Sequence, residues 1–321
     1  MKPSFHHAAL NGPFGDPAVY VRILRERAGL LFDMGDISSL PVKEIMKLTD
    51  VFITHMHIDH FVGFDHILRA LLRRKNPVSL YGPEGITDCV EGKLKGYSWN
   101  LITEYPLKIN VCEVIADEII ESSFSARNSF RRKTEERRPF NGTLLERNMF
   151  SVRSVILDHG IQALGFKLEE KFHINIDKSM LLQYGMQVGP WLNRLKQAIW
   201  EGAYDCLINT GANDIEVRDL SDLYKITEGQ KIAYIMDSSP SDENYRSIVD
   251  FVRGCDTLYI EAYFVDSDMN LAIQKNHLTS GMAGRIAVEA GIKDLKILHF
   301  SPRYIDEPER LIDEAMGTFR H

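Results

Sequence analysis

The chain has 321 residues, enough for one large domain or two small ones. Its hydrophobic fraction of 44% is ordinary for a globular protein with a sizeable core. Lys and Arg number 38 against 45 Asp and Glu, and the resulting net charge of −7 argues against a protein that coats nucleic acid through its overall charge. A nucleic-acid enzyme with a local basic patch is still compatible with this balance.

The cysteines and the apolar runs indicate the compartment. The 4 cysteines are scattered and form no CxxC pair, which excludes a disulfide scaffold and favours a reducing compartment. The first residues, Met1 to His7, lack the apolar stretch of a signal peptide, and no apolar run approaches the roughly 18 residues that span a bilayer. We therefore expect a cytoplasmic protein with no membrane partner.

Short β-type runs alternate with helical patterns along most of the chain. In chain order, strands are predicted at 18–24, 29–33, 50–54, 78–81, 154–157, 206–209, 233–236, 257–260 and 296–299. Helices are predicted at 43–48, 64–74, 241–253 and 280–290. This alternation is typical of an α/β protein in which helices cover the faces of sheets.

Two segments interrupt the alternation, and we expect them to be insertions into a single domain spanning residues 1–321. One is about 122–150 and the other about 173–204, where His173 is expected to be exposed. The first contains a basic run that is either a solvated loop or a positive footprint for nucleic acid. The candidate RNA-contacting residues of this run are Arg131, Arg132, Lys133, Arg137 and Arg138.

The strongest chemical signal is the segment Thr54-His55-Met56-His57-Ile58-Asp59-His60, placed between a predicted strand and a helical pattern. Packing does not explain three imidazoles and one carboxylate within six residues. Imidazole suits zinc and related divalent metals, and carboxylate supplies an oxygen ligand or a proton acceptor. The segment therefore predicts a metal site.

Three later residues, His159, Asp237 and His299, each follow an apolar β-type run. Alone, each is typical of a cap or a turn, but their positions at strand ends match those where sheets present site residues. Asp33 also ends a predicted strand, and it is either an acceptor for a ligand imidazole or a turn residue.

The pattern His55-x-His57-x-Asp59-His60 after an apolar strand resembles the signature of the metallo-β-lactamase superfamily. That resemblance implies an α/β fold built as a four-layer αββα sandwich. More narrowly, the chain is similar to the ribonuclease Z family of transfer-RNA 3′-endonucleases over most of residues 29–305. The segments that carry this similarity are Leu157–Phe166, Asp237–Pro240, Cys255–Phe264, Asn276–Ser280 and Gly185–Leu195.

Two features follow from the family's pattern. Gly189-Pro190 resembles the Gly-Pro stretch near the family's RNA-holding arm, which makes the segment 173–204 arm-like. Residues Asn11–Pro17 stand where the family has a Gly-Thr-Gly-Ser loop near the scissile site.

The resemblance also implies roles for the site residues. One divalent ion would be held by His55, His57 and His159, a second by Asp59, His60 and His299, and Asp237 would bridge them. The ions would be zinc, with manganese or iron as alternatives. Metal-bound hydroxide would attack phosphorus, Asp59 would orient or deprotonate the water, and Glu261 with His277 would protonate the leaving oxygen.

Three functions compete at this stage. The first is a phosphodiesterase acting on RNA, with precursor transfer RNA as the substrate and a homodimer as the assembly. The second is a hydrolase of a small phosphodiester, an ester or a lactone. The third is a non-catalytic protein that binds metal or nucleic acid, and it ranks last because every candidate ligand and both acid residues are present.

Overall fold

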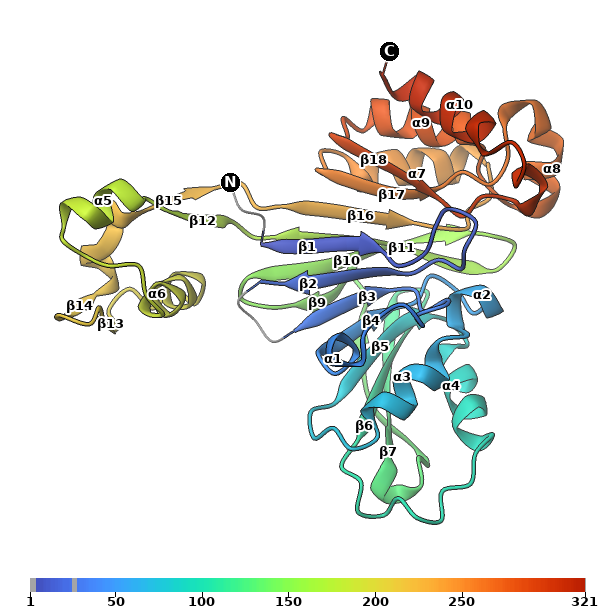
Figure 1. Ribbon diagram of the computed structural model, residues 1–321. Coiled ribbons are helices and arrows are strands. Elements are labelled where there is room, and N and C mark those ends of the chain that lie inside the picture. Colours follow the sequence, from blue (N-terminus) through green and yellow to red (C-terminus); the bar gives the residue numbers. More distant parts are fainter. Residues whose placement is uncertain (1–3, 25–27, 321) are drawn as a thin grey trace.

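The computed structural model describes residues 4–24 and 28–320, and two large sheets form its centre (Figure 1). The eight strands of the first sheet follow one another in chain order across it: β1 (Phe5–Ala9), β2 (Val19–Ile23), β3 (Gly29–Phe32), β4 (Leu48–Phe52), β5 (Val78–Pro83), β6 (Lys108–Ile115), β7 (Glu118–Ser125) and β8 (Arg132–Pro139). The second sheet has the order β18-β17-β16-β11-β10-β9. Its strands are β9 (Thr143–Glu146), β10 (Phe150–Asp158), β11 (Gln162–Glu170), β16 (Lys231–Ile235), β17 (Thr257–Glu261) and β18 (Asp294–Leu298).

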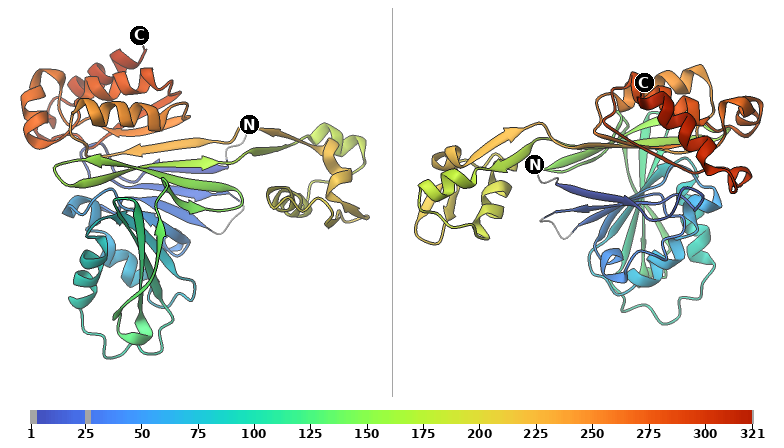
Figure 2. Two further views of the ribbon diagram at one scale, coloured as in Figure 1. Left: turned by 180° about the vertical axis from the view of Figure 1, so that it is seen from behind. Right: turned by 45° about the horizontal axis from the view of Figure 1, so that its top comes forward.

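Helices cover the outer face of each sheet. The first sheet carries α1 (Val42–Ile45), α2 (Ile58–Phe61), α3 (Phe64–Leu71) and α4 (Ile86–Lys95) on its side of the molecule. The second sheet carries α7 (Asp242–Val252), α8 (Met269–Lys275), α9 (Ser280–Glu289) and α10 (Pro308–Arg320). Short 3₁₀ turns, η1 (Ala126–Asn128), η3 (Asp266–Asp268) and η4 (Pro302–Tyr304), connect these elements. The predicted four-layer αββα sandwich is confirmed (Figure 2).

Aromatic side chains fill the space between the two sheets. The Phe52 ring centroid lies 5.1 Å from that of Phe32 and 5.7 Å from that of Phe166, and the Tyr234 centroid lies 5.8 Å from that of Phe32. All four side chains are almost fully buried. Phe32 and Phe52 come from the first sheet and the other two from the second, so this cluster joins the sheets.

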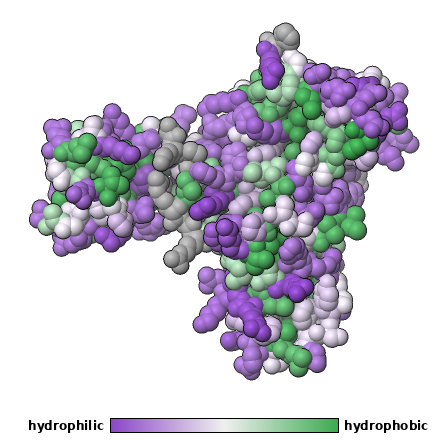
Figure 3. Space-filling model, viewed as in Figure 1, coloured by the Kyte–Doolittle hydropathy of each residue, from purple (hydrophilic) through white to green (hydrophobic). Residues whose placement is uncertain are grey.

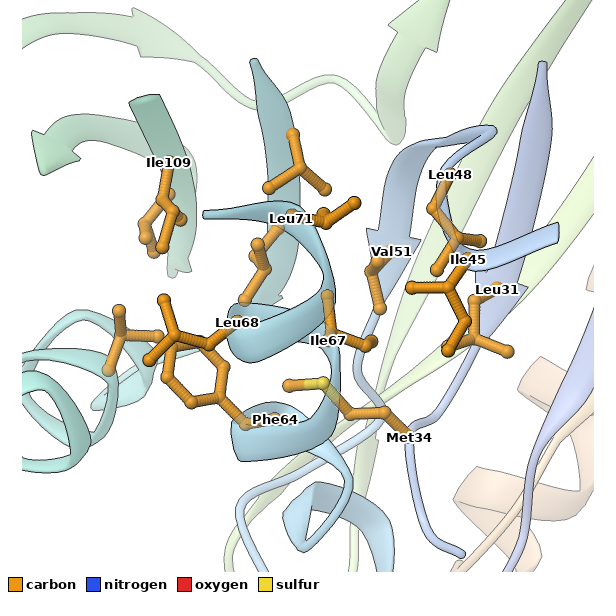
Figure 4. Close-up of a cluster of buried hydrophobic side chains, with 14 of the residues drawn as sticks. Leu31, Met34, Ile45, Leu48, Val51, Phe64, Ile67, Leu68, Leu71 and Ile109 are labelled. Carbon is orange, nitrogen blue, oxygen red and sulfur yellow. The ribbon is translucent and has the colours of Figure 1, made fainter. Parts of the chain in front are cut away.

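Strand β3 is apolar along its whole length, and β4 is apolar except at Thr49 and Asp50, because both faces of these strands are largely buried. Successive side chains of a strand point to opposite faces, so Phe32 and Phe52 face the other sheet while Leu31 and Val51 face the helices. On that side α3 buries Phe64, Ile67, Leu68 and Leu71, whose spacing keeps them on one face of the helix (Figure 4).

An arm projects from the body on two strands, β12 (His173–Ile176) and β15 (Tyr224–Thr227) (Figures 1 and 2). It contains α5 (Lys178–Gln183), α6 (Trp191–Trp200), η2 (Val217–Leu223) and the hairpin of β13 (Leu207–Asn209) and β14 (Asp214–Glu216). A separate apolar core around Trp191 and Leu195 holds these elements together. The strand predicted at 206–209 therefore lies in the arm and not in either large sheet.

The root of the arm is fixed by a buried polar cluster. Ser4 Oγ donates to Glu170 Oε1 at 2.5 Å, and His173 Nδ1 lies 3.1 Å from both of these oxygens. His173 is only 4% exposed, so the expectation of an exposed side chain is wrong. The reason is that β12 begins where the arm still packs against Ser4, the residue before β1.

Residues 122–150 run through the end of β7, then η1, β8 and β9, to the start of β10. β8 is an edge strand of the first sheet and β9 an edge strand of the second, so the segment extends both sheets instead of forming a loop. A basic composition suits such a position because an edge strand exposes side chains, and charge discourages pairing with other chains.

The face of the molecule seen in Figure 3 is largely hydrophilic, with hydrophobic patches on both the arm and the body. Within the described ranges, no helix has both the length and the apolar character needed to cross a bilayer.

Candidate metal centre

The candidate site residues lie where strands of both sheets end. His55 follows β4 in the first sheet, and His159, Asp237 and His299 follow β10, β16 and β18 in the second. Strands β16, β17 and β18 are parallel, and β10 runs in the same direction because two antiparallel pairings separate it from β16. Their carboxyl ends therefore meet at one edge, as is usual for sites in α/β sheets.

Three of these residues have a left-handed backbone. The φ angles of Asp33, Asp237 and His299 are 55°, 53° and 56°. Side chains other than glycine rarely adopt this region, and each such residue costs about 1–3 kcal/mol. The surrounding structure holds each residue there, just after its strand, so that the next residues turn away while the side chain stays at the sheet edge.

All seven predicted ligands lie together in groups whose ligand atoms are within 4.8 Å of one another. The first group is His55, His57, His159 and Asp237, and the second is Asp59, His60 and His299. A third group contains Asp237, Glu261, His277 and His299, and it joins the predicted acid pair to the other two.

The carboxylate of Asp237 is at the centre of the cluster and is 2% exposed. Its Oδ2 lies 3.3 Å from His55 Nε2, 3.2 Å from His60 Nε2 and 3.6 Å from His159 Nε2, and its Oδ1 lies 2.6 Å from His299 Nδ1. Although burial opposes ionisation, the charges of His299 and His60 hold the pKa of Asp237 well below its ordinary value.

The histidines of the cluster differ in their electrostatic environments. Burial, together with the charge of His60, lowers the pKa of His55 to about 2. Burial also acts on His60, but the carboxylates of Asp33 and Asp237 outweigh it and raise the pKa of His60 to about 10. A divalent ion binds deprotonated ligands, so it would take the place of the protons that these groups hold without it.

Buried atoms without hydrogen bonds test whether a metal fits this donor set. His55 Nε2, His60 Nε2, Asp237 Oδ1 and His299 Nδ1 are buried and have no partner in hydrogen-bonding geometry, although the last two atoms lie only 2.6 Å apart. Buried polar atoms are nearly always satisfied, so such a concentration of orphan atoms at one point requires an explanation. Imidazole nitrogens and a carboxylate oxygen aimed at one another fit a divalent-metal site.

Asp33 orients His60 through the ring nitrogen that faces away from the cluster. Its Oδ2 accepts hydrogen bonds from His60 Nδ1 at 2.8 Å and from the Tyr234 hydroxyl at 2.9 Å, and its Oδ1 accepts from the Thr54 backbone N–H at 2.7 Å. The carboxylate therefore keeps the His60 proton on Nδ1 and leaves Nε2 facing the cluster. Of the two roles open to Asp33 from the sequence, its contacts match the acceptor for a ligand imidazole.

His159 is oriented in the same way by a backbone group. Its Nδ1 donates to the carbonyl oxygen of Asn276 at 2.7 Å, which leaves Nε2 facing Asp237. Asn276 has a left-handed backbone, with a φ of 57°, and ends α8 directly before His277. One turn thus positions both a candidate ligand and a candidate acid.

Glu261 and His277 form a hydrogen-bonded pair beside the cluster. His277 Nδ1 lies 2.8 Å from Glu261 Oε2, and the backbone N–H of Ser238 donates to Glu261 Oε1 at 2.7 Å. Glu261 is fully buried, while His277 is partly exposed. The pair therefore has a fixed, buried carboxylate and an imidazole that can reach a bound molecule.

The sequence analysis missed Tyr234, Tyr263 and the Asn276 carbonyl. Tyr263, whose ring is stacked on His277, could have been found, because alternation along an extended segment places it on the same side as Glu261. No sequence signal marks Tyr234 or a backbone carbonyl, since their roles depend on strands and turns far apart in the chain.

The predicted RNA-contacting residues are not brought to the cluster. Strand β8 runs in the same direction as β4, so its start, with Arg131, Arg132 and Lys133, lies toward the edge of the sheet opposite the site. Arg137 and Arg138 lie toward the site's edge, but β8 is the edge strand of the sheet, four strands away from β4. Acidic neighbours also engage it: Arg132 pairs with Asp88 and Glu91, Arg137 with Glu118, and Arg138 with Glu121.

The chain is similar to known proteins in both sequence and fold. No family model matches it. The ribonuclease Z of Deinococcus radiodurans is 28% identical over 311 residues, covering 92% of this chain and 90% of that protein. The ribonuclease Z of Trichodesmium erythraeum is 30% identical over 307 residues, covering 92% and 82%.

Two solved structures share the fold. The metallo-β-lactamase fold protein YhfI from Bacillus subtilis has a TM-score of 0.57 at 15% identity, covering 98% of this chain and 92% of that one. The short form of human tRNase Z has a TM-score of 0.53 at 19% identity, with 94% and 93% covered. The fold and the His/Asp cluster define the class, a metal-dependent hydrolase of the metallo-β-lactamase fold. Within that class, the chain belongs to the ribonuclease Z family.

Replacing Asp33 with Asn should weaken metal binding by about 10-fold to 100-fold, the usual effect of losing a partner that orients a ligand. The reason is that the amide of the variant has an NH₂ group in place of one carboxylate oxygen. That NH₂ group cannot accept the hydrogen bonds that the oxygen now accepts. Competition with a chelator, followed by elemental analysis, measures the change.

Asp50→Asn is the matched control, since Asp50 is equally buried but bonds the Tyr81 hydroxyl away from the cluster. Equal metal affinity in the Asp33 variant and the control would show that Asp33 does not support a ligand.

Proposed function

We propose that this protein is a dinuclear-metal endoribonuclease that cleaves a phosphodiester bond of precursor transfer RNA. The observation that carries the proposal is the Glu261–His277 pair, 2.8 Å apart and grouped with Asp237 and His299 of the metal cluster. An ester with an activated leaving group needs no such pair, whereas a departing ribose oxygen is a poor leaving group unless it is protonated. The ribonuclease Z relatives support RNA as the substrate.

We assign one ion to His55, His57 and His159 and a second to Asp59, His60 and His299, with Asp237 shared between them. Five imidazole and two carboxylate ligands of this kind suit zinc, and manganese or iron would also accept them. When bound, such ions lower the pKa of a water molecule and neutralise charge on the phosphoryl group.

Asp59 is suited to hold the attacking water. Its side chain is 35% exposed, the most accessible carboxylate of the cluster, and its Oδ2 accepts from His299 Nε2 at 3.2 Å. Although burial opposes ionisation, this bond and the charge of His60 lower the pKa of Asp59 to about 2. Its exposure leaves Asp59 accessible to water, so it is the carboxylate placed to accept the proton of the water as the water oxygen bonds to phosphorus.

His277 is suited to complete the reaction from the other side. Glu261 holds the Nδ1 proton, so Nε2 is the atom that can donate a proton to the leaving 3′ oxygen as its bond to phosphorus breaks. The carboxylate also stabilises the charged imidazole that must exist before the transfer. Burial and the Ser238 N–H keep Glu261 in place throughout.

Changing His277 to Ala should slow cleavage of precursor transfer RNA by about 10²–10⁴-fold, the usual contribution of a general acid. Hydrolysis of bis(p-nitrophenyl) phosphate should fall far less, because p-nitrophenolate leaves without protonation. Single-turnover rates on both substrates, with metal content measured alongside, test this. Equal losses on the two substrates, or loss of metal, would mean that His277 is a ligand or a structural residue.

A smaller phosphodiester is the second candidate substrate, and the charge around the site favours it. The loop Asn11–Pro17 packs on the His299 side of the site, where the Phe300 N–H donates to the Pro13 carbonyl at 2.7 Å. Burial and the charges of Asp59 and Asp36 raise the pKa of Asp16 in this loop. The arm is also acidic, with 6 Lys or Arg and 8 Asp or Glu between residues 171 and 230.

RNA contacts would then come from local patches such as the start of β8. Strand β8 alone is about 26 Å long, at about 3.3 Å for each of its eight residues, so only a substrate with the dimensions of a folded RNA would reach from the site's edge to the start of β8. Neutralising Arg131, Arg132 and Lys133 together should reduce RNA cleavage and flatten its dependence on salt, because fewer counterions are released.

Hydrolysis of bis(p-nitrophenyl) phosphate by this triple variant should not change, because the three residues lie away from the cluster. Efficient RNA cleavage with the original salt dependence would exclude this patch.

We also propose a homodimer in the cytoplasm. A groove of about 940 Å³ beside α3, lined in part by Leu68, Leu72 and Trp99, is the kind of apolar surface that a second copy covers. All 4 cysteines are free, which suits a reducing compartment. Light scattering should give twice the mass of the chain, and the mass of a monomer would exclude the dimer.

A further inference from the structure

The ring of Tyr263 lies flat against the imidazole of His277. The two ring centroids are 3.8 Å apart and the planes differ by only 5°. The other described aromatic neighbours of His277, namely His159, Phe264 and His299, meet it at angles of 60°, 62° and 70°. Tyr263 is thus the neighbour that lies along a face of the imidazole.

The backbone of Tyr263 is fixed between two loops of the site. Its N–H donates to the carbonyl of Leu278 at 3.2 Å, and its own carbonyl accepts from the Ser301 N–H at 3.1 Å. Leu278 follows His277 directly, and Ser301 lies two residues after His299. The segment after β17 therefore joins the loop of the candidate acid to the loop of a candidate ligand.

The side chain makes the same connection. Besides stacking on His277, the Tyr263 ring lies 5.1 Å from the His299 ring at an angle of 68°. A ring held from both sides by its backbone and by an edge contact provides a rigid surface for the imidazole. A flexible aliphatic side chain could fill this space but could not provide a flat one.

The hydrogen bond to Glu261 alone does not fix the direction of Nε2. It holds one atom of the imidazole, Nδ1, while the final torsion of a histidine side chain is broad. Parallel stacking limits the tilt of the ring about that atom and is itself favourable beyond the burial of the two rings. An aromatic face also attracts the charged imidazole that proton donation requires.

We propose that Tyr263 is a positioning residue for proton donation by His277, a role that rests on the proposed phosphodiesterase function. Glu261 fixes Nδ1 and Tyr263 fixes the plane of the ring, so that together they aim Nε2 at the leaving oxygen. A misplacement of about 1 Å at a reacting group can cost about 10²-fold in rate. The stack is therefore expected to matter only for substrates that need a proton donor.

The test compares Tyr263→Leu, which removes the flat ring, with Tyr263→Phe, which keeps it and removes only the hydroxyl. In the zinc-loaded protein, Tyr263→Leu should slow single-turnover cleavage of precursor transfer RNA by about 10-fold to 100-fold, part of the general-acid contribution. Hydrolysis of bis(p-nitrophenyl) phosphate should change by less than about 3-fold. Tyr263→Phe should cleave the RNA at a rate within about 3-fold of the original protein. Both variants should keep their metal.

A double-mutant cycle separates positioning from general stability. In a His277→Ala background, Tyr263→Leu should cause no further loss, because the group that it positions is already absent. NMR gives a second reading that does not depend on activity: the imidazole carbon-bound protons of His277 should carry an upfield ring-current shift that is kept in Tyr263→Phe and lost in Tyr263→Leu.

Equal losses on both substrates, additive losses in the double variant, or failure of Phe to restore the rate would overturn the role of Tyr263. Loss of metal in Tyr263→Leu would also overturn it, in favour of support for His299. If the original protein cleaves neither substrate when loaded with metal, the proposed function falls and this role falls with it. These outcomes are distinguishable because the first set requires an active parent enzyme.

Discussion

The buried carboxylate of Asp237 is the constraint on which the site depends. An ionised group removed from water is costly unless charges and hydrogen bonds compensate it, and four imidazoles approach this one within 3.6 Å. Those imidazoles come from both sheets, so the sheets must pack in one register for the carboxylate to be satisfied. The hydrogen bond from Tyr234 in the second sheet to Asp33 in the first fixes the same register a short distance away.

Much of the fold and of the candidate site could be predicted from the sequence because the information is local. An apolar strand followed by closely spaced imidazoles and a carboxylate is visible within seven residues, and His159, Asp237 and His299 each directly follow their own strand. The remaining contacts depend on tertiary structure. Tyr263 meets His277 only because two loops pack together, and the partners of Arg132 on α4 lie more than forty residues earlier. Charge in a sequence does not reveal which acidic groups neutralise it.

The candidate metal centre and the arm are built on separate parts of the fold. The candidate ligands His55, His159, Asp237 and His299 lie at buried strand ends, whereas the arm leaves the body on β12 and β15 and has its own apolar core. Because each region has a separate core, substitutions in the arm should leave the packing around the candidate metal centre undisturbed.

The left-handed backbone at Asp33, Asp237 and His299 has a consequence for how this sequence can diverge. Apart from glycine, only Asn, Asp and His adopt that conformation at moderate cost, so the backbone restricts these positions to a few residues before chemistry restricts them further. A descendant that loses its ions would be expected to carry Asn or Gly there more often than Ala or Val. Such a sequence would keep the backbone shape of the site while losing its charge. These three positions would identify it as a homologue that has lost its catalytic activity.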